Sequence, residues 1–362
     1  MSLAFPVSAH PRPASEASLT AALGDPGFGR FFGDHMAVAT WRSDTGWGDA
    51  GVVPYGPFRL DPAGAVLHYG QEIFEGLKAY RHDDGSVWLF RPEMNARRLN
   101  ASAARLGLPE LPEEDFLASV MALVEADQRW VPSAEGEQSL YIRPFMFANE
   151  NFLGVRAAET VQYAVIAGPV GPYFSGGVKP VDIWVTTEFS RAGAGGTGAA
   201  KCGGNYASSL VAQKEAYAHG CSQVLFTDAA THSWLEELGG MNIFLVTRDG
   251  RLLTPPTSGT ILDGITRSSI LAVAPWFDLV PEVRPVSLAE VTDGIGSGEI
   301  VEAFACGTAA VITPIGSFRQ AGQADLVLAR PEGDRSMVLR SHLLDIQYGR
   351  AADPNGWTVR VC

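Results

Sequence analysis

The chain has 362 residues, of which 46% are hydrophobic and 19% charged, which is the profile of a folded globular protein with a sizeable core. Its 40 Asp and Glu residues against 27 Lys and Arg give a formal net charge of -13, and so acidic a protein is not expected to bind nucleic acid. The four cysteines include no CxxC pair and are too few for a disulfide framework.

Two features of the sequence indicate where the protein works. The first twenty residues lack the basic start and the continuous apolar core of a signal peptide, and no stretch approaches the apolar length of a membrane span. Because the cysteines are also typical of a reducing compartment, we expect a soluble cytoplasmic protein that does not bind membranes.

The first half of the chain reads as an arm followed by strands and helices. Residues 1–30 are rich in Ala, Pro and Ser, and we expect a loosely attached arm. Short strands come next, then two helices with apolar residues at helical spacing, then two longer strands. We place these elements at 35–41, within 80–92, and at 93–108, 115–130, 141–148 and 161–168.

Gly and Pro concentrate in the segment GPVGPYFSGGVKP at 168–180, a composition typical of a hinge. Beyond it the sequence predicts a strand at 181–189, a helix capped by Asn205 and stopped by Gly220, the strands QVLFTD and MNIFLVT, and a helix over 266–274. The order of elements predicts an α+β fold. We place a smaller N-terminal α/β domain at 1–172, an interdomain loop at 173–180 and a larger C-terminal domain at 181–362.

Several common site motifs fail on context or spacing. The run GAGGTG at 193–198 fits the dinucleotide pattern GxGxxG, but it continues as AAKCGG before any helical pattern begins, which indicates a loop. The seven histidines form no HExxH and no paired Cys/His cluster, so we expect no metal site. A GxSxG elbow and a GxxxxGK[ST] loop are also absent from the sequence.

Lys201 is the residue that these exclusions leave. It stands in AAKCGGNY, among residues with almost no side chains, where the backbone can approach another group closely. A catalytic lysine must be neutral part of the time, because only the free amine attacks a carbonyl, and a pocket that excludes water favours that form. Such a lysine can hold pyridoxal phosphate as a Schiff base.

The sequence also offers the other groups that this cofactor needs. Its ring nitrogen requires a carboxylate, and LEELGGMN places Glu236 and Glu237 before a glycine turn. Its phosphate requires a cup, which the helix start at Ile265 and Thr266 would supply. Tyr206, at the start of a helix five residues after Lys201, would turn its hydroxyl toward the lysine. Each feature alone is ordinary, and the prediction rests on their occurring together.

At this point the sequence resembles the branched-chain amino acid aminotransferases, class IV pyridoxal-phosphate enzymes of fold type IV. The likeness covers roughly residues 30–350. It is carried by DHMAVATW, LHYGQEIFEGLKAYR, LFRPEMNARRL, YIRPFMFANENFLGV, KCGGNYASSL, LEELGGMNIF, LLTPPTSGTILDGITR, VEAFACGTAAVITPI and LLDIQYG. The resemblance implies two domains, the C-terminal one with a barrel-like β core.

The resemblance also implies roles for individual residues around the cofactor. Lys201 becomes the Schiff-base lysine and proton carrier, and Glu237 the carboxylate that faces the pyridine nitrogen, with Glu236 as its neighbour. Tyr206 matches the tyrosine on the ring oxygen. The phosphate-binding residues implied in this way are Arg98, Ile265, Thr266 and Thr308.

Substrate groups follow from the same resemblance. Thr308 and Ala309 would offer backbone N–H groups to the substrate carboxylate, and Arg143 would receive the distal carboxylate of glutamate. The residues implied as walls of an apolar pocket are Phe74, Tyr141 and Tyr173. The family's enzymes are homodimers with shared sites, which implies that Tyr69, Leu153 and Val155 reach across to the partner.

The implied activity is a ping-pong transfer of the amino group from L-leucine, L-isoleucine or L-valine to 2-oxoglutarate. A D-amino acid aminotransferase and an aminodeoxychorismate lyase share the fold and the lysine and are the alternatives. A dinucleotide-binding protein that uses residues 193–198 is the alternative from another class. Two departures from relatives stand out: Ala310 and Thr313 occupy the positions of a redox-active CxxC, and Gly240 replaces a threonine.

Overall fold

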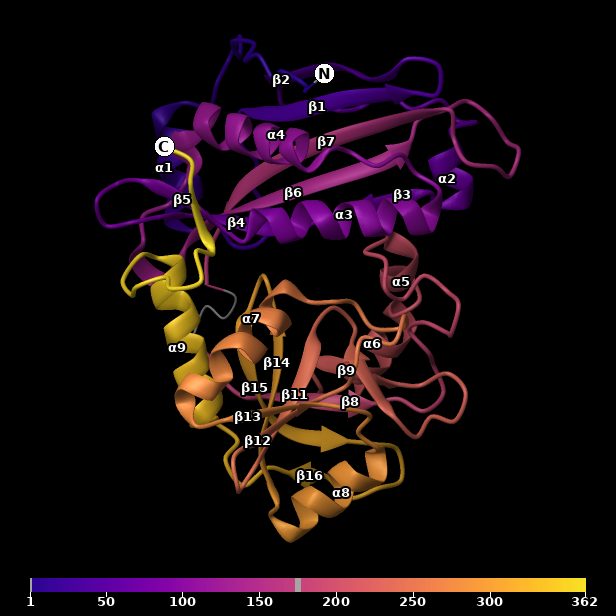
Figure 1. Ribbon diagram of the computed structural model, residues 1–362, viewed down its shortest axis with the longest axis vertical. Coiled ribbons are helices and arrows are strands. Elements are labelled where there is room, and N and C mark those ends of the chain that lie inside the picture. Colours follow the sequence, from indigo (N-terminus) through magenta and orange to yellow (C-terminus); the bar gives the residue numbers. More distant parts are fainter. Residues whose placement is uncertain (1, 173–176) are drawn as a thin grey trace. The chain divides into compact units, whose positions relative to one another are not determined.

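The computed structural model describes residues 2–172 and 177–362, and the chain divides into two compact units. Unit 1 comprises Met1–Ser175, Ala200–Gly203 and Asp345–Cys362, and unit 2 comprises Gly176–Ala199 and Gly204–Leu344. Figure 1 labels the elements of both units. Part of the predicted interdomain loop, residues 173–176, lies outside the described residues.

Unit 1 is built on a mostly antiparallel sheet with the strand order β17-β5-β4-β6-β7-β1-β2, in which β3 pairs with β6. The longest pairing joins β6 to β7, from Ser139 opposite Val170 to Ala148 opposite Val161. The strands are β1 (His35–Arg42), β2 (Gly46–Pro54), β3 (Glu72–Phe74), β4 (Leu77–Arg81), β5 (Val87–Phe90), β6 (Ser139–Ala148), β7 (Thr160–Val170) and β17 (Thr358–Arg360).

Two helices of unit 1 pack on this sheet (Figure 1). Helix α3 begins with Pro92, whose fixed φ suits a first turn, and ends at Gly107, which has a φ of +66°. Its Ala96, Leu99 and Ala103 are buried at the spacing of one helical face. The helical elements of the unit are α1 (Glu16–Gly24), α2 (Ala65–Tyr69), α3 (Pro92–Leu106), α4 (Glu113–Ala126), η1 (Gln128–Trp130) and η2 (Glu135–Glu137).

The expectation of a loosely attached N-terminal arm is wrong. Ser15 caps helix α1, and the Arg129 guanidinium donates hydrogen bonds to the carbonyl of Ala14 at 2.5 Å and to Asp34 Oδ2 at 2.9 Å. Asp34 in turn accepts the N–H of Ala14 at 2.7 Å, so the segment from 14 to 34 is a loop closed at its base. The partners lie far apart in the sequence, which is why the composition of the arm gave no sign of them.

Unit 2 is built on a mixed sheet with the strand order β10-β9-β8-β15-β14-β11-β12-β13, in which β16 pairs with β15. Its strands curl in Figure 1, and the curl accords with the predicted barrel-like core. The strands are β8 (Val181–Val185), β9 (Gln223–Thr227), β10 (Leu235–Leu238), β11 (Asn242–Thr247), β12 (Arg251–Thr254), β13 (Val280–Val283), β14 (Ile300–Gly307), β15 (Val311–Arg319) and β16 (Leu326–Val327).

The helices of unit 2 correct one prediction and confirm another. They are α5 (Gly203–Ala207), α6 (Leu210–Ala218), α7 (Ile265–Val273), η3 (Ala274–Phe277), α8 (Leu288–Ser297) and α9 (Arg335–Gln347), and α9 ends in unit 1. Asn205 caps no helix: it lies inside α5, and its side chain bonds to Thr197. Gly220 ends the predicted helical segment with a φ of +72°, as expected.

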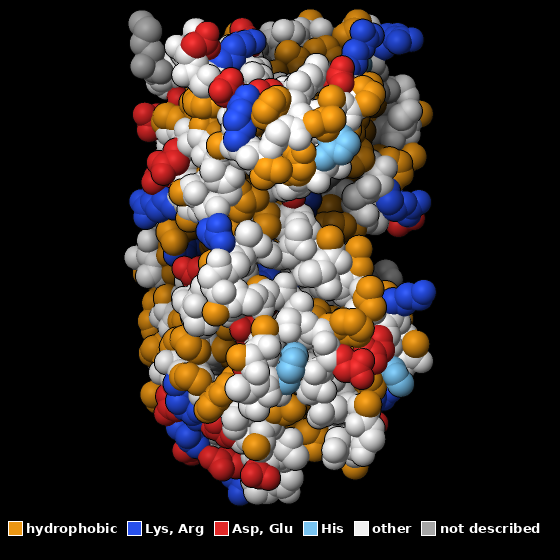
Figure 2. Space-filling model, turned by 90° about the vertical axis from the view of Figure 1, so that its right-hand side faces the viewer, with side chains coloured by type: hydrophobic (Ala, Val, Ile, Leu, Met, Phe, Trp, Pro, Cys, Tyr) orange, Lys and Arg blue, Asp and Glu red, His pale blue; other side chains and the backbone are white. Residues whose placement is uncertain are grey.

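One face of the surface carries charge of both signs. On the face drawn in Figure 2, acidic and basic side chains are interspersed with hydrophobic ones. Among the described residues no helix is long and apolar enough to cross a membrane.

Candidate active site

Lys201 belongs to unit 1, because the four residues Ala200–Gly203 pack with that unit. Its N–H donates to Ser102 Oγ at 2.9 Å, and its carbonyl accepts the N–H of Phe74 at 2.9 Å. The Lys201 Nζ lies 4.8 Å from the centroid of the Phe74 ring. A strand and a helix of the sheet unit therefore hold the lysine backbone, and an aromatic face lies beside its amine.

The surroundings of Lys201 favour its neutral form. Burial and the positive charge of Arg98 lower the pKa of Lys201 to about 8, although the Glu75 carboxylate opposes the shift. An amine with this pKa is partly unprotonated near neutral pH, which is the form that attacks a carbonyl. The predicted chemistry of Lys201 therefore has a physical basis within unit 1.

Arg98 and Glu75 form a bidentate ion pair next to the lysine. Arg98 Nε donates to Glu75 Oε1 at 2.7 Å and Arg98 Nη2 to Glu75 Oε2 at 2.8 Å, and Asn95 Nδ2 also donates to Oε2 at 2.7 Å. Burial alone would raise the pKa of Glu75, but Arg98 outweighs burial and the pKa lies below its usual range. Glu75 was not predicted to be a site residue. The available signal was an acidic residue within the largely apolar motif FEGLKAY.

A cavity of about 210 Å³ lies in unit 1, and its lining includes the predicted substrate residues Tyr141 and Arg143. Arg143 Nη2 donates to the Tyr141 hydroxyl at 3.1 Å, and the guanidinium carbon lies 4.7 Å from the Phe74 ring centroid. The Arg143 Nε is buried without a hydrogen-bond partner among the described residues. The cavity thus combines apolar walls with one guanidinium that retains donor capacity.

One wall of this cavity was not predicted from the sequence, and one predicted wall residue lies outside the described residues. Phe28 and Gly29 of the arm and Phe31 and Phe32 just after it line the cavity, and the Phe28 ring packs edge-on against Tyr141 at 5.0 Å. An aromatic cluster at the end of an otherwise small and polar arm was the available signal. Tyr173, the third predicted wall, lies outside the described residues.

In unit 2, Glu237 is a buried carboxylate with three donors. Arg191 Nη1 lies 2.8 Å from its Oε1, the N–H of Leu262 donates to Oε1 at 2.9 Å, and Asn242 Nδ2 donates to Oε2 at 3.2 Å. Burial raises the pKa of its neighbour Glu236. Neither Arg191 nor Asn242 was predicted to be a site residue, since nothing in the local sequence ties them to Glu237.

The turn that starts helix α7 is built around Asn242. Asn242 Nδ2 also donates to the carbonyl of Leu262 at 3.0 Å, and a Cβ at Gly264 would overlap Asn242 Oδ1. Gly264 is the N-cap of α7 and supplies no side-chain cap, so the helix begins directly with Ile265 and Thr266. One amide side chain therefore joins Glu237 to the predicted phosphate-binding helix start.

Three further predicted residues, Tyr206, Thr308 and Ala309, lie in segments that meet residues 240–242. A Cβ at Gly240 would lie 3.6 Å from a carbon of the Tyr206 ring. Cys306 pairs with Asn242 across β14 and β11, and Thr308 and Ala309 follow it in the connection to β15. Unit 2 thus gathers Glu237, Tyr206, the start of α7 and the segment of Thr308 around residues 240–242.

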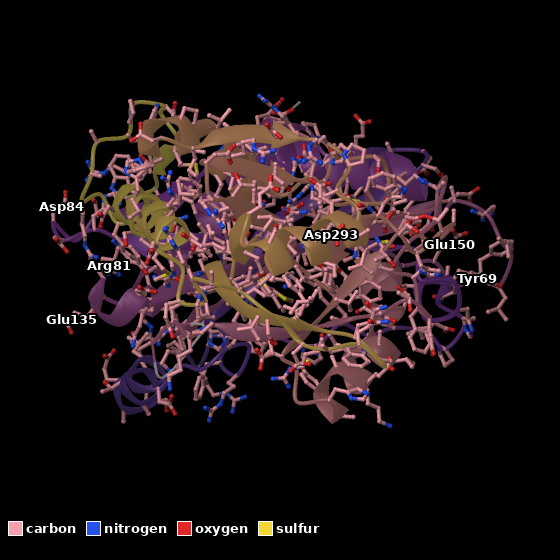
Figure 3. The ribbon with its side chains drawn as sticks, turned by 90° about the horizontal axis from the view of Figure 1, so that it is seen from below. Tyr69, Arg81, Asp84, Glu135, Glu150 and Asp293 are labelled. Carbon is pink, nitrogen blue, oxygen red and sulfur yellow. The ribbon has the colours of Figure 1, made fainter. Side chains whose placement is uncertain are left out.

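The residues expected to reach a partner subunit are at the surface of unit 1. Tyr69, Leu153 and Val155 are 43%, 58% and 87% exposed, and the Tyr69 hydroxyl donates to the Leu153 carbonyl. Figure 3 shows Tyr69 near Glu150 at one edge of the molecule, where the N–H of Ala65 donates to the Glu150 carbonyl at 3.0 Å. These apolar groups therefore occupy an exposed edge.

The two units carry the kinds of group that pyridoxal phosphate requires. Unit 1 supplies a buried lysine of lowered pKa, and unit 2 supplies a buried carboxylate beside a helix N-terminus. Within the described ranges no cluster of His, Cys, Asp and Glu side chains is suited to hold a metal ion. In each unit the residues present fit a need of this organic cofactor, and these kinds of group are those of a pyridoxal-phosphate-dependent class of protein.

Comparison with known proteins identifies the family. The sequence profile of Amino-transferase class IV matches residues 72–318, and the chain belongs to this pyridoxal-phosphate-dependent family. The branched-chain-amino-acid aminotransferase of Mycolicibacterium smegmatis is 50% identical over 362 residues, covering 99% of this chain and 98% of that one. A probable branched-chain-amino-acid aminotransferase of Streptomyces coelicolor is 52% identical over 350 residues, covering 97% and 96%.

Solved structures agree with this assignment. The branched-chain amino acid aminotransferase of Escherichia coli has a TM-score of 0.73 at 25% identity, covering 90% of this chain and 100% of that one. Another branched-chain amino acid aminotransferase, solved with pyridoxamine 5'-phosphate, has a TM-score of 0.73 at 25% identity, covering 90% and 99%. The predicted α+β fold of type IV and the predicted cofactor are therefore confirmed. The roles of individual site residues stay predictions.

Proposed function

We propose that the protein is a branched-chain amino acid aminotransferase that transfers the amino group of L-leucine, L-isoleucine or L-valine to 2-oxoglutarate by a ping-pong mechanism. The observation that carries the proposal is the cavity of unit 1, which combines apolar walls with Arg143. Both substrate types must use one pocket: a branched side chain needs the apolar walls, and 2-oxoglutarate needs a cation for its second carboxylate. The names of the relatives at about 50% identity point the same way.

The chain's residues divide the work around the cofactor. Bound pyridoxal phosphate supplies an electron sink for loss of the substrate α-proton. Lys201 binds the cofactor aldehyde and, once released, carries the α-proton on its Nζ. We assign the ring nitrogen to Glu237, the ring oxygen to Tyr206, and the phosphate to Arg98, Ile265, Thr266 and Thr308.

The substrate is held by the cavity and by backbone groups. We assign the walls for the branched side chain to Phe74, Tyr141 and Tyr173. Arg143, supported by the Tyr141 hydroxyl, receives the distal carboxylate of 2-oxoglutarate. The backbone N–H groups of Thr308 and Ala309 hold the carboxylate that both substrates share.

We also propose a homodimer with shared active sites in the cytoplasm. The exposed edge supports the dimer because its apolar groups are clustered: Tyr69 bonds to the Leu153 carbonyl and Val155 follows two residues later, and clustered exposed apolar groups are typical of an interface. The four free cysteines support a reducing compartment. Along the sequence we keep the domain division 1–172, 173–180 and 181–362 as a proposal, with Ala200–Gly203 and Asp345–Cys362 as the parts of the C-terminal range that pack with unit 1.

One experiment tests the function. The visible spectrum of the purified protein with pyridoxal phosphate is recorded before and after L-leucine, and again after 2-oxoglutarate. The proposal expects the cofactor band to bleach with L-leucine and to return with 2-oxoglutarate, while Lys201→Ala abolishes turnover. Bleaching by D-alanine but not by L-leucine would instead support a D-amino acid aminotransferase. A protein that takes up no cofactor would contradict the proposal altogether.

A further inference from the structure

We propose that Ser102 and Glu72 are positioning residues for Lys201, because their side chains hold the chain at the lysine and two residues beyond it. The inference rests on the proposed role of Lys201 and adds residues that neither the sequence motifs nor the comparisons assign to it. It starts from the placement of Ala200–Gly203 in unit 1, although the chain on both sides of them belongs to unit 2. Side chains or backbone groups of unit 1 must therefore bind these four residues.

Ser102 makes the first of these contacts. It is buried in α3, where its hydroxyl donates to the carbonyl of Arg98 at 2.9 Å and accepts the N–H of Lys201 at 2.9 Å. A hydroxyl has one proton, so the bond to Arg98 directs an oxygen lone pair toward the lysine N–H. One side chain thus fixes the lysine backbone relative to the helical turn that presents the Arg98 guanidinium.

Strand β3 makes the second set of contacts, through hydrogen bonds of two residues on the same side of the strand. The N–H of Phe74 donates to the Lys201 carbonyl at 2.9 Å, and the Glu72 carboxylate accepts the N–H of Gly203. A Cβ at Gly203 would overlap this carboxylate, so glycine is needed for the approach. The bond to Phe74 is made by its backbone, which leaves Ser102 and Glu72 as the side chains that mutation can remove.

These contacts determine the depth of the lysine amine. The amine lies 4.8 Å from the Phe74 ring centroid. Burial, Arg98 and Arg143 lower its pKa to about 8, while Glu75 and Tyr141 act in the opposite direction. If one of these hydrogen bonds is lost, the backbone relaxes outward. The amine then becomes more hydrated and lies further from Arg98. Both changes favour the protonated form, which does not attack a carbonyl.

The test measures the basicity of the lysine directly rather than through turnover. Apo-protein is mixed with pyridoxal phosphate across a pH series. The covalent product is trapped with borohydride and located at Lys201 by peptide mapping. The pH at which the attachment rate is half-maximal gives the midpoint of titration of the lysine amine. For Ser102→Ala we expect the midpoint to rise by about 1 pH unit, which leaves about tenfold less neutral amine at pH 7. We expect kcat to fall by a similar factor with KM little changed.

The matched control is Ser119→Ala. Ser119 is also a buried helical serine, and its hydroxyl donates to the Phe116 carbonyl at 2.7 Å, but it lies on α4 and does not bond to the lysine segment. This variant should lose stability and keep the wild-type midpoint. A Ser102→Ala protein with the wild-type midpoint and kcat would overturn the proposal, whereas a wild-type protein that attaches no cofactor at Lys201 would overturn the proposed function instead.

A second pair of variants keeps the test valid if Ser102→Ala does not fold. Glu72→Gln retains an oxygen that accepts the Gly203 N–H, whereas Glu72→Ala removes it. We expect Glu72→Ala to raise the midpoint and Glu72→Gln to lie between it and wild type. Equal midpoints for wild type and both variants would contradict the role of Glu72.

Discussion

The guanidinium of Arg191 and the carboxylate of Glu237 form an ion pair of 2.8 Å, and their side chains are only 2% and 3% exposed. Arg191 Nη1 also donates to the carbonyls of Thr260 at 3.1 Å and of Gly198 at 3.4 Å. A Cβ at Gly198 would overlap the Thr260 backbone. The last glycine of the run 193–198 therefore permits a close backbone approach around Arg191, and the run needs no bound nucleotide to explain it.

Breaking this pair should be costly. In Arg191→Met the buried Glu237 carboxylate loses its ion pair with Arg191, and the free energy of unfolding should fall by about 3–5 kcal/mol. Chemical denaturation of the apo-protein measures it. The control is Arg42→Met, which breaks an exposed pair with Asp49 and should cost less than about 1 kcal/mol. Equal losses for the two variants would refute a special role of the buried pair.

Lys201 should make the stability of the apo-protein depend on pH. Its pKa is about 8 when folded, below the ordinary value of 10.5, so between these values the unfolded chain binds a proton that the folded protein has released. Stability due to this group therefore rises with pH across that window, and below it the lysine destabilises the fold. At pH 7 Lys201→Met should be more stable than wild type by about 1–3 kcal/mol.

The advantage of Lys201→Met should shrink as the pH rises from about 8 to 10.5, which thermal or chemical unfolding at several pH values will show. Lys214→Met is the control, because Lys214 is an exposed residue of α6. A difference between Lys201→Met and wild type that stays constant with pH would mean that the lysine is not shifted.

Two glycines near Glu237 should respond differently to an added methyl group. In Gly264→Ala the Cβ overlaps Asn242 Oδ1, so the amide must release Glu237 or Leu262, and we expect a loss of about 1–3 kcal/mol. In Gly240→Ala the Cβ meets the Tyr206 ring at 3.6 Å, an ordinary contact, and the change should stay within about 0.5 kcal/mol. Thermal denaturation of both variants measures the loss of stability. Similar losses for the two variants would count against the role of Asn242.

Arg143 should separate the two substrates. Arg143→Gln removes the cation from the cavity, so the KM for 2-oxoglutarate should rise by about 10–100-fold, while the KM for L-leucine changes by much less. Steady-state kinetics with each substrate varied in turn will show the difference. If both KM values rise equally, Arg143 has a general structural role rather than one in recognising the second carboxylate.

The sequence predicted what depends on local pattern and on motif. The strand at 35–41, the helix over 93–108 and the stop at Gly220 follow from periodicity and from glycine, and the structure has them as β1, α3 and a left-handed residue. Lys201 was found because a lysine among small residues is unusual. These signals lie within a few residues of the feature that they predict.

The partners of the site residues were not predicted, because they are set by long-range packing. Ser102 lies 99 residues from Lys201, and Asn242 reaches both Glu237 and the carbonyl of Leu262, 20 residues further on. The arm was misjudged for the same reason: its contacts with Arg129 span more than a hundred residues. A serine, an asparagine or an arginine carries no mark in the sequence that says which backbone group it will meet.

Strand β17 has a consequence for how the protein is made. It pairs with β5, from Thr358 opposite Phe90 to Arg360 opposite Trp88, so an edge of the unit 1 sheet is formed by residues that leave the ribosome roughly 270 positions after their partners. At about 5–20 residues per second that delay is roughly 15–50 s. During that time β5 exposes an unpaired edge while all of unit 2 is being synthesised, so the nascent chain must protect that edge from aggregation until Thr358–Arg360 emerge.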